Sequence, residues 1–172
     1  MKIYLIGLPS SGKTTLGKQL AQAIHSEFID MDDLIEQNEK KTIAEIFAQK
    51  GEDYFRKSEQ KTLTDLIAQE NKKLIISTGG GVPCFFDNMK QMNANGATIY
   101  LKVSPKELVR RLKGTGTASR PLLNGKKVEE LEREITVKLE ERDQFYSQAQ
   151  YVLEGDSLHL NDLINLVKYV FD

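Results

Sequence analysis

The sequence predicts an α/β fold, a three-layer sandwich in which helices cover both faces of a five-stranded parallel sheet. Five short apolar runs alternate with segments that have helical spacing, which is the pattern of parallel α/β proteins. Several of these runs are apolar at consecutive positions, as strands covered on both faces are. A glycine-rich turn joins the first run to the first helical segment, which is typical of a ligand site at the carboxyl edge of such a sheet.

The elements follow from these patterns in chain order. Strands are expected at residues 3–7, 27–30, 73–78, 97–103 and 151–154. Helices are expected at residues 13–25, 32–39, 42–50, 52–70, 85–94, 105–113, 127–148 and 159–171. Ser104 before Pro105 predicts a helix start, because serine caps helices and proline is favoured at the first helical position. Too little chain follows the loose stretch at 114–125 for a second domain, so 1–172 is expected to form one domain with a mobile loop.

The composition excludes several classes of protein. The 172 residues carry a formal net charge of -1, whereas proteins that bind nucleic acids or membrane surfaces usually have a large basic excess. No apolar run approaches the roughly 20 residues of a membrane span. Cys84 is the only cysteine, which excludes an intrachain disulfide and fits a reducing compartment. We therefore expect a cytoplasmic protein without nucleic-acid or membrane partners.

Residues 7–14, GLPSSGKT, match the phosphate-binding P-loop pattern G-x-x-x-x-G-K-[ST]. The glycines allow successive backbone N–H groups to converge on a polyanion, and the following helix directs its positive dipole end to the same place. Lys13 is expected to reach the β- and γ-phosphates, and the Thr14 hydroxyl to bind Mg²⁺. A glycine turn that merely opens a helix is the alternative, but the strand before it and the helix after it favour nucleotide binding.

The second strand ends in FIDMDD, with acidic side chains that allow two interpretations. Asp30 and Asp32 share one face of an extended segment near the P-loop, where they could hold Mg²⁺ through water or accept a proton. Either residue could instead cap the helix that follows. The residues alone favour neither interpretation.

Three further groups are candidates for a substrate site. Arg56 and Glu59 share a helical face, where a surface ion pair is the commoner arrangement. Three glycines at 79–81 follow a buried strand and leave its end open to close approach by a ligand. Arg142 and Tyr146 lie one helical turn apart near the end of the chain.

In order and spacing, the P-loop, DMD, GEDYFRKSE, GGG, RPLL and ERDQFY resemble the shikimate kinase family of P-loop enzymes, related to nucleoside monophosphate kinases. The resemblance spans residue 3 to about 155. It implies the sheet order 2-3-1-4-5, a shikimate-binding segment at about 31–60 and a lid at about 114–125. It also implies transfer of the γ-phosphate of ATP to the 3-hydroxyl of shikimate during aromatic amino acid biosynthesis, by an enzyme expected to be a monomer.

The resemblance assigns roles to individual residues. Lys13, Asp32 and Arg120 are implied to be catalytic, and Mg²⁺ to be held by Thr14 and, through water, Asp30. ATP is implied to contact Ser10, Ser11, Gly12, Lys13, Thr14, Thr15, Arg111 and the lid residue Arg120. Shikimate is implied to contact Asp32, Arg56, Gly79, Gly80, Gly81 and Arg142, with Glu59 orienting Arg56. The chemistry agrees, because guanidinium groups bind a carboxylate as a fork and an aspartate accepts hydrogen bonds from neighbouring hydroxyls.

Two positions depart from the family pattern. Ser10 stands where a third P-loop glycine is more common, and we expect serine to follow the loop with a negative φ and without loss of function. The segment 154–162 lacks the basic residue that many relatives place beside the adenine, which leaves Arg111 to stack on the base.

Two other functions remain as alternatives. One is a kinase of the same fold that acts on gluconate or a nucleoside monophosphate. The other is a regulator that binds a nucleotide without turnover, against which the joint presence of Asp32, Arg56, Arg120 and Arg142 argues.

Overall fold

The structure is a computed structural model that describes residues 1–70, 72–114 and 127–171. Its strands are β1 (Lys2–Ile6), β2 (Glu27–Asp30), β3 (Leu74–Ser77), β4 (Ala97–Lys102) and β5 (Tyr151–Glu154). Its α-helices are α1 (Lys13–Ala23), α2 (Met31–Glu39), α3 (Ile43–Ile67), α4 (Asn88–Asn95), α5 (Pro105–Gly114), α6 (Val128–Tyr146) and α7 (Leu160–Phe171). A short 3₁₀ helix, η1, spans Val82–Cys84.

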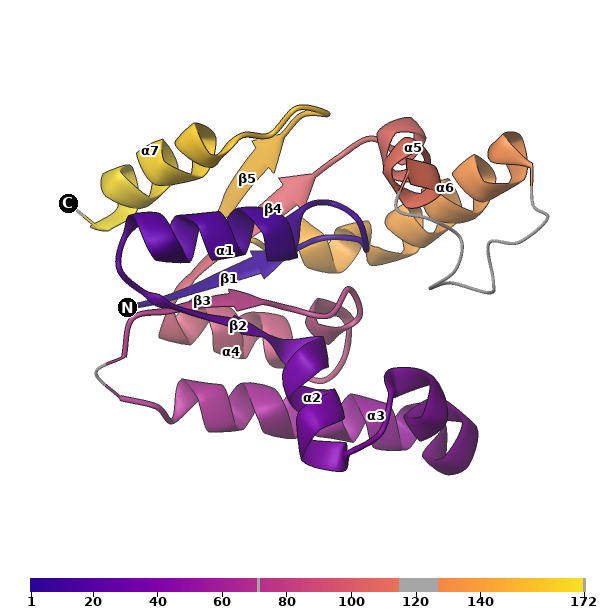
Figure 1. Ribbon diagram of the computed structural model, residues 1–172, viewed down its shortest axis with the longest axis horizontal. Helices are drawn as coiled ribbons and strands as arrows, with labels where there is room; N and C mark the ends of the chain where they lie inside the picture. The colour runs from indigo at the N-terminus through magenta and orange to yellow at the C-terminus, as the bar shows by residue number, and fades with distance from the viewer. Residues whose placement is uncertain (71, 115–126, 172) are drawn as a thin grey trace.

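The strands form one parallel sheet in the order β2-β3-β1-β4-β5, as predicted (Figure 1). In the register of the sheet, Ser77 at the end of β3 pairs with Asp30 on one side and with Leu5 on the other. The carboxyl ends of β1, β2 and β3 therefore meet at one edge. The P-loop, the acidic end of β2 and the glycine triplet all begin there.

Alternation along the strands divides the core into two layers. Ile3, Leu5 and Ile75 face α1 and α7, and they pack with residues such as Leu20 and Leu163. Tyr4, Ile6, Leu74, Ile76 and Tyr100 face the opposite layer, where they pack with residues of α3, α4 and α6 that include Leu63, Met92 and Tyr146. Apolar side chains on both faces explain why the strands are continuous apolar runs in the sequence.

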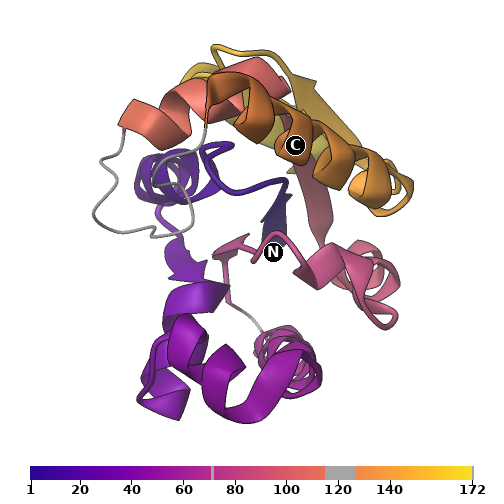
Figure 2. The same cartoon turned by 90° about the vertical axis from the view of Figure 1, so that its right-hand side faces the viewer.

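The helix α2 and the first part of α3 lie on one side of the strand ends, with α5 and α6 on the other (Figure 2). Ile35, Ile46 and Phe55 make a small apolar cluster between α2 and α3. Gly51 interrupts α3 with φ 79° and ψ 175°, at the position where the sequence predicts a break between two helices.

The helix expected at 85–94 starts later than predicted. Phe85 is extended, Phe86 has a positive φ of 51°, and α4 begins at Asn88. The Asn88 side chain donates a hydrogen bond to the carbonyl of Val82 at 2.9 Å, which fixes a turn where the sequence pattern suggests a helix. The serine cap of α5 is confirmed, because Ser104 Oγ accepts a hydrogen bond from the Glu107 N–H at 3.2 Å.

No helix within the described ranges has both the length and the apolar character of a membrane-spanning helix. Arg120 and nearly all of the predicted lid, residues 115–125, lie outside the described residues.

Candidate active site

The P-loop joins the end of β1 to the start of α1. Gly12 precedes the helix with a left-handed φ of 104°, which a residue with a side chain adopts only with strain. Ser11 is buried, while Thr14 and Thr15 are exposed in the first turn of α1. The left-handed backbone at Gly12 lets the chain turn tightly into α1, whose first N–H groups favour an anion.

Ser10 corrects one expectation from the sequence. Its φ is +68°, not negative, so serine occupies the left-handed conformation that glycine would adopt without strain. The carbonyl of Ser10 accepts a hydrogen bond from Arg111 Nη1 at 3.3 Å, which helps to hold this peptide in place. The path of the loop, rather than the preference of the residue, therefore sets this backbone angle.

Lys13 lies inside the P-loop. Its Nζ donates hydrogen bonds to the carbonyls of Gly7 and Leu8, both at 2.9 Å, and the residue is only 8% exposed. These carbonyls hold the ammonium group within the loop. A bound polyanion would offer the same group stronger, charged acceptors.

Asp30 caps the helix that follows, which is one of the roles that the sequence left open, and its second oxygen faces the P-loop. Its Oδ1 accepts a hydrogen bond from the Asp32 N–H at 3.1 Å and so caps α2. Its Oδ2 accepts from Thr14 Oγ1 at 2.8 Å. Two hard oxygen donors, one from the P-loop and one from β2, therefore lie together.

These two oxygens fit magnesium, which is usually bound by one or two protein oxygens together with phosphate oxygens and water. Among the described residues, no group of three or more acidic, histidine or cysteine side chains could hold a metal by itself. A metal at Thr14 and Asp30 would thus depend on the nucleotide for its remaining ligands.

The glycine triplet lies against the side chains that the sequence assigns to the acceptor. A Cβ at Gly79 would come within 2.6 Å of Asp32 Oδ1, and a Cβ at Gly80 within 2.9 Å of Arg142 Nη1. A Cβ at Gly81 would overlap the guanidinium of Arg56. Only glycine leaves room for this approach, so the end of β3 forms a backbone surface with Asp32, Arg56 and Arg142 around it.

Two carboxyl groups meet at Gly79. A Cβ there would come within 3.0 Å of Glu59 Oε1, in addition to its contact with Asp32. Burial raises the pKa of Asp32 to about 6, with a further contribution from the charge of Asp30. Burial also raises the pKa of Glu59 to about 7, against the opposing effect of its hydrogen bond with Arg56. Both acids therefore titrate close to neutral pH.

Arg56 has more partners than the sequence suggested. Its Nη1 donates to Glu59 Oε2 at 2.8 Å, and Glu59 is 1% exposed, so this is a buried pair and not a surface one. Its Nε and Nη2 donate to Glu52 Oε1 at 3.1 and 2.8 Å. The guanidinium carbon also lies 4.2 Å from the centre of the Phe85 ring, a cation–π contact.

Glu52 and Phe85 are not among the site residues predicted from the sequence. Glu52 lies four residues before Arg56 on the same helix, and this spacing is a signal that could have identified it. Phe85 contacts Arg56 only because the chain turns after η1, and no local pattern in the sequence indicates that turn.

Arg142 and Tyr146 converge on one peptide group. Arg142 Nη1 donates to the Gly80 carbonyl at 2.8 Å, and the Tyr146 hydroxyl donates to the same oxygen at 2.6 Å. Tyr146 is fully buried and stacks at a tilt on Tyr100 of the sheet. The end of α6 is thereby fixed to the glycine triplet, with Arg142 held at Gly80.

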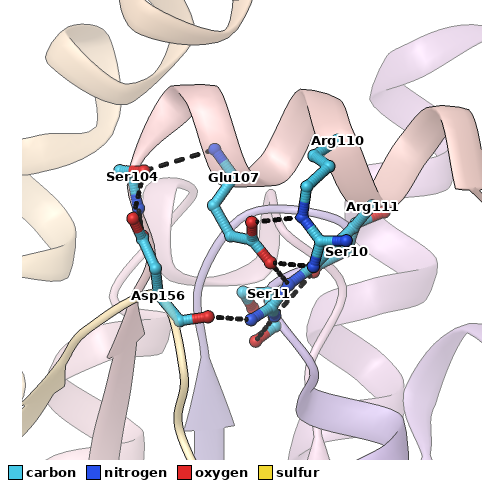
Figure 3. A network of polar contacts seen from close by, with 7 residues as sticks. All are labelled: Ser10, Ser11, Ser104, Glu107, Arg110, Arg111 and Asp156. Carbon is cyan, nitrogen blue, oxygen red and sulfur yellow. Dashed lines mark hydrogen bonds and ion pairs between the residues drawn. The ribbon is translucent and has the colours of Figure 1, made fainter.

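Arg111 lies at the back of the P-loop. Its guanidinium contacts loop carbonyls and the segment that follows β5, and these contacts are described below (Figure 3). The structure thus groups the predicted residues into a nucleotide side around the P-loop and an acceptor side around Gly79, Gly80 and Gly81.

Comparisons with known proteins agree with this arrangement. The family model described as shikimate kinase matches residues 9–168. A shikimate kinase of Bacteroides fragilis is 46% identical over 92% of this chain and 87% of its own length.

Solved structures give the same result. The crystal structure of shikimate kinase from Bacteroides thetaiotaomicron superposes with a TM-score of 0.90 at 41% identity and covers 98% of both chains. The shikimate kinase from Acinetobacter baumannii, solved in complex with shikimate, has a TM-score of 0.80 at 34% identity, over 98% of this chain and 91% of that one. From its P-loop to its last helix, the chain therefore belongs to the shikimate kinase family.

Proposed function

We propose that this protein transfers the γ-phosphoryl group of ATP to the 3-hydroxyl of shikimate, giving shikimate 3-phosphate and ADP. The observation that carries the proposal is the convergence of Asp32, Arg56 and Arg142 on the glycine triplet, next to a P-loop. The A. baumannii relative, which was solved with shikimate, supports the choice of acceptor. The reaction belongs to the synthesis of aromatic amino acids.

The acceptor site suits a hydroxylated carboxylic acid. Arg56 and Arg142 supply two guanidinium groups, each of which can bind a carboxylate as a fork. Asp32 approaches the triplet from the side of the P-loop and can accept hydrogen bonds from two neighbouring hydroxyl groups. To bind the substrate, Arg56 would exchange its exposed contact with Glu52 for the substrate and keep its buried contact with Glu59.

Phosphoryl transfer depends on positioning and charge more than on strong base catalysis, because the transition state is loose. Lys13 would move from the carbonyls of Gly7 and Leu8 to the transferred phosphoryl group and stabilise its charge. Asp32 would orient the attacking hydroxyl and take its proton late in the step. Thr14 and Asp30 would hold Mg²⁺, which neutralises charge on the β- and γ-phosphates.

Other parts of the assignment rest on the family resemblance. Ser10, Ser11, Gly12 and Thr15 would contact the phosphates, and Arg111 the base. Arg120 would meet the phosphates from the lid. We also propose that the protein acts as a monomer in the cytoplasm, where ATP is available.

The test is ADP release with Mg·ATP, measured with and without shikimate. We expect release to depend on shikimate and to be absent with gluconate or nucleoside monophosphates. Lys13→Ala should lower the turnover by orders of magnitude, since it removes charge stabilisation of the transition state. Equal turnover with another acceptor would indicate a different kinase of this fold. Binding of Mg·ATP without phosphorylation of any acceptor would indicate a regulator that binds a nucleotide without turnover.

A further inference from the structure

Arg111 connects three segments that are far apart in the sequence (Figure 3). Its Nη1 donates to the carbonyls of Ser10 and Ser11 at 3.3 and 3.1 Å. Its Nη2 donates to the carbonyl of Asp156, after β5, at 2.8 Å. Its Nε donates to Glu107 Oε1 on its own helix at 2.8 Å. Each of the three guanidinium nitrogens thus has a protein acceptor.

The contacts with the P-loop follow from how such a loop binds phosphate. When successive peptides direct their N–H groups into the concave side, carbonyl groups are left on the other side and need donors of their own. Lys13 donates to the carbonyls of Gly7 and Leu8 at the first half of the loop. Arg111 donates to two carbonyls of the second half, from outside.

Arg111 is well placed to hold the loop in shape. Its side chain is 24% exposed, and a Cβ at Gly12 would lie 3.6 Å from its Nη1, so the guanidinium rests directly on the loop backbone. One of the carbonyls that it holds belongs to Ser10, whose φ of +68° is unfavourable for serine. A charge-assisted hydrogen bond at this peptide offsets part of that cost.

Two acidic residues hold Arg111 in turn. The Glu107 carboxylate accepts from both Arg111 and Arg110, and these hydrogen bonds lower the pKa of Glu107 to about 2, so that it stays ionised. The Asp156 carboxylate accepts from the N–H and the Oγ of Ser104, both at 3.0 Å, at the start of α5. The carbonyl of Asp156 is thereby fixed where Arg111 reaches it.

We propose that Arg111 is a positioning residue for the phosphates of the nucleotide, which acts through the P-loop backbone with Glu107 and Asp156 as its supports. This role is separate from any contact with the base. It predicts that Arg111 affects ligands that have phosphates and no base, whereas a residue that only stacks on adenine would not affect them. The inference extends the nucleotide site of the proposed function.

The first test uses Mg·tripolyphosphate, ADP and adenosine as ligands in calorimetric titrations without shikimate, so that it does not depend on the identity of the acceptor. Arg111→Met keeps the aliphatic stem and removes the donors. Arg110→Met is the matched control, because Arg110 is 74% exposed and its hydrogen bonds within the described residues go to Glu107. We expect Arg111→Met to weaken tripolyphosphate and ADP alike by about tenfold or more, and Arg110→Met to change either by less than about twofold.

A second variant separates positioning from simple charge. Glu107→Leu removes a negative charge, and the loss of Coulomb repulsion alone would strengthen the binding of an anion at the P-loop. If Glu107 supports Arg111, the same variant weakens tripolyphosphate instead. The opposite signs make the experiment decisive, and thermal melting confirms that each variant is folded.

The proposal is overturned if Arg111→Met weakens ADP but leaves tripolyphosphate unchanged, which would make Arg111 a contact to the base only. It is also overturned if Glu107→Leu strengthens tripolyphosphate binding. That result would mean that Glu107 and Arg111 affect the phosphates only through their charges. Arg111→Lys should restore part of the lost affinity for tripolyphosphate, because one ammonium group can reach a loop carbonyl but not the Asp156 carbonyl at the same time.

Discussion

Thr14 donates a hydrogen bond to Asp30 at 2.8 Å and thereby joins the P-loop to the end of β2. Asp32, two residues later, lies instead against Gly79. The two carboxylates are neighbours in the sequence but belong to opposite sides of the site, so their substitutions should have different effects.

We expect Asp30→Asn to raise the Mg²⁺ concentration required for activity, because it weakens one oxygen ligand. Asp32→Asn should lower kcat with shikimate strongly and leave Mg·ATP binding nearly unchanged, since it keeps one acceptor oxygen but loses the charge and the basicity that act on the attacking hydroxyl. Mg²⁺ titrations of both variants measure the difference. Rescue of Asp32→Asn, and not of Asp30→Asn, by excess Mg²⁺ would mean that the two roles are reversed.

Arg56→Lys and Arg142→Lys should each raise the KM for shikimate roughly ten- to a hundredfold, because lysine keeps the charge but cannot form a fork; the loss corresponds to about 1.5–3 kcal/mol. The KM for ATP should stay close to that of the unmodified protein. Arg133→Lys is the control, since Arg133 is an exposed residue of α6, the helix of Arg142. A similar loss for both substrates would assign the two arginines to the fold rather than to the acceptor.

The raised pKa of Asp32, about 6, should appear in the pH profile. Below that pH the carboxyl group is protonated, so it has lost the negative charge that strengthens its hydrogen bonds with hydroxyl groups and can no longer take their proton. We therefore expect kcat/KM for shikimate to fall as the pH decreases through about 6, and the same inflection to be missing in Asp32→Asn. A profile that is flat from pH 5 to pH 8 would exclude Asp32 as the group that must be ionised.

The same shift predicts an effect on stability. The pKa of Asp32 rises from 3.8 to about 6 on folding, so the folded state disfavours the charged form. The resulting destabilisation is absent below the unfolded pKa, grows between pH 4 and pH 6, and is complete above pH 6. At pH 8, Asp32→Asn should therefore raise the free energy of unfolding by about 1–3 kcal/mol. Thermal melts at pH 8 and at pH 4 provide the check, because the gain should disappear at pH 4.

Ser10→Gly should relieve the left-handed backbone of the P-loop. Serine at a φ of +68° costs about 1–2 kcal/mol, while glycine adds about 0.4–1 kcal/mol of unfolded-state entropy, so a net gain of up to about 1.6 kcal/mol is expected. Ser147→Gly is the control, since Ser147 has a φ of -66° and the variant should lose stability. Denaturant unfolding measures both, and a loss of stability in Ser10→Gly would contradict the strain.

Much of the fold could be predicted because each apolar run is short and bounded by turns. The strand order came from the family resemblance, since runs of similar composition, such as 73–78 and 97–103, do not reveal which neighbours they pair with. The start of α4 was missed because a side chain, Asn88, and not a local backbone preference, decides where the helix begins.

The sequence indicates which residues belong to the candidate site better than it indicates the contacts that they make. The glycine triplet indicated that a ligand could approach the backbone closely. In the structure, the side chains of Asp32, Arg142 and Arg56 approach it. The sign of φ at Ser10 could not be read from the residue type, because the loop imposes it. The bonds of Arg111 to Ser10, Ser11 and Asp156 span at least 45 positions in the chain, a separation that no local pattern can bridge.

The three consecutive glycines at the end of β3 each lie against different side chains of the acceptor site. A methyl group at Gly79 would press on Asp32 and Glu59, one at Gly80 on Arg142 and Pro9, and one at Gly81 on Arg56. A substitution at any one of these glycines would therefore disturb a different part of the site that recognises the acceptor. A new acceptor preference, whether it arises in evolution or in the laboratory, therefore has to come from the surrounding side chains, while this stretch of backbone stays as it is.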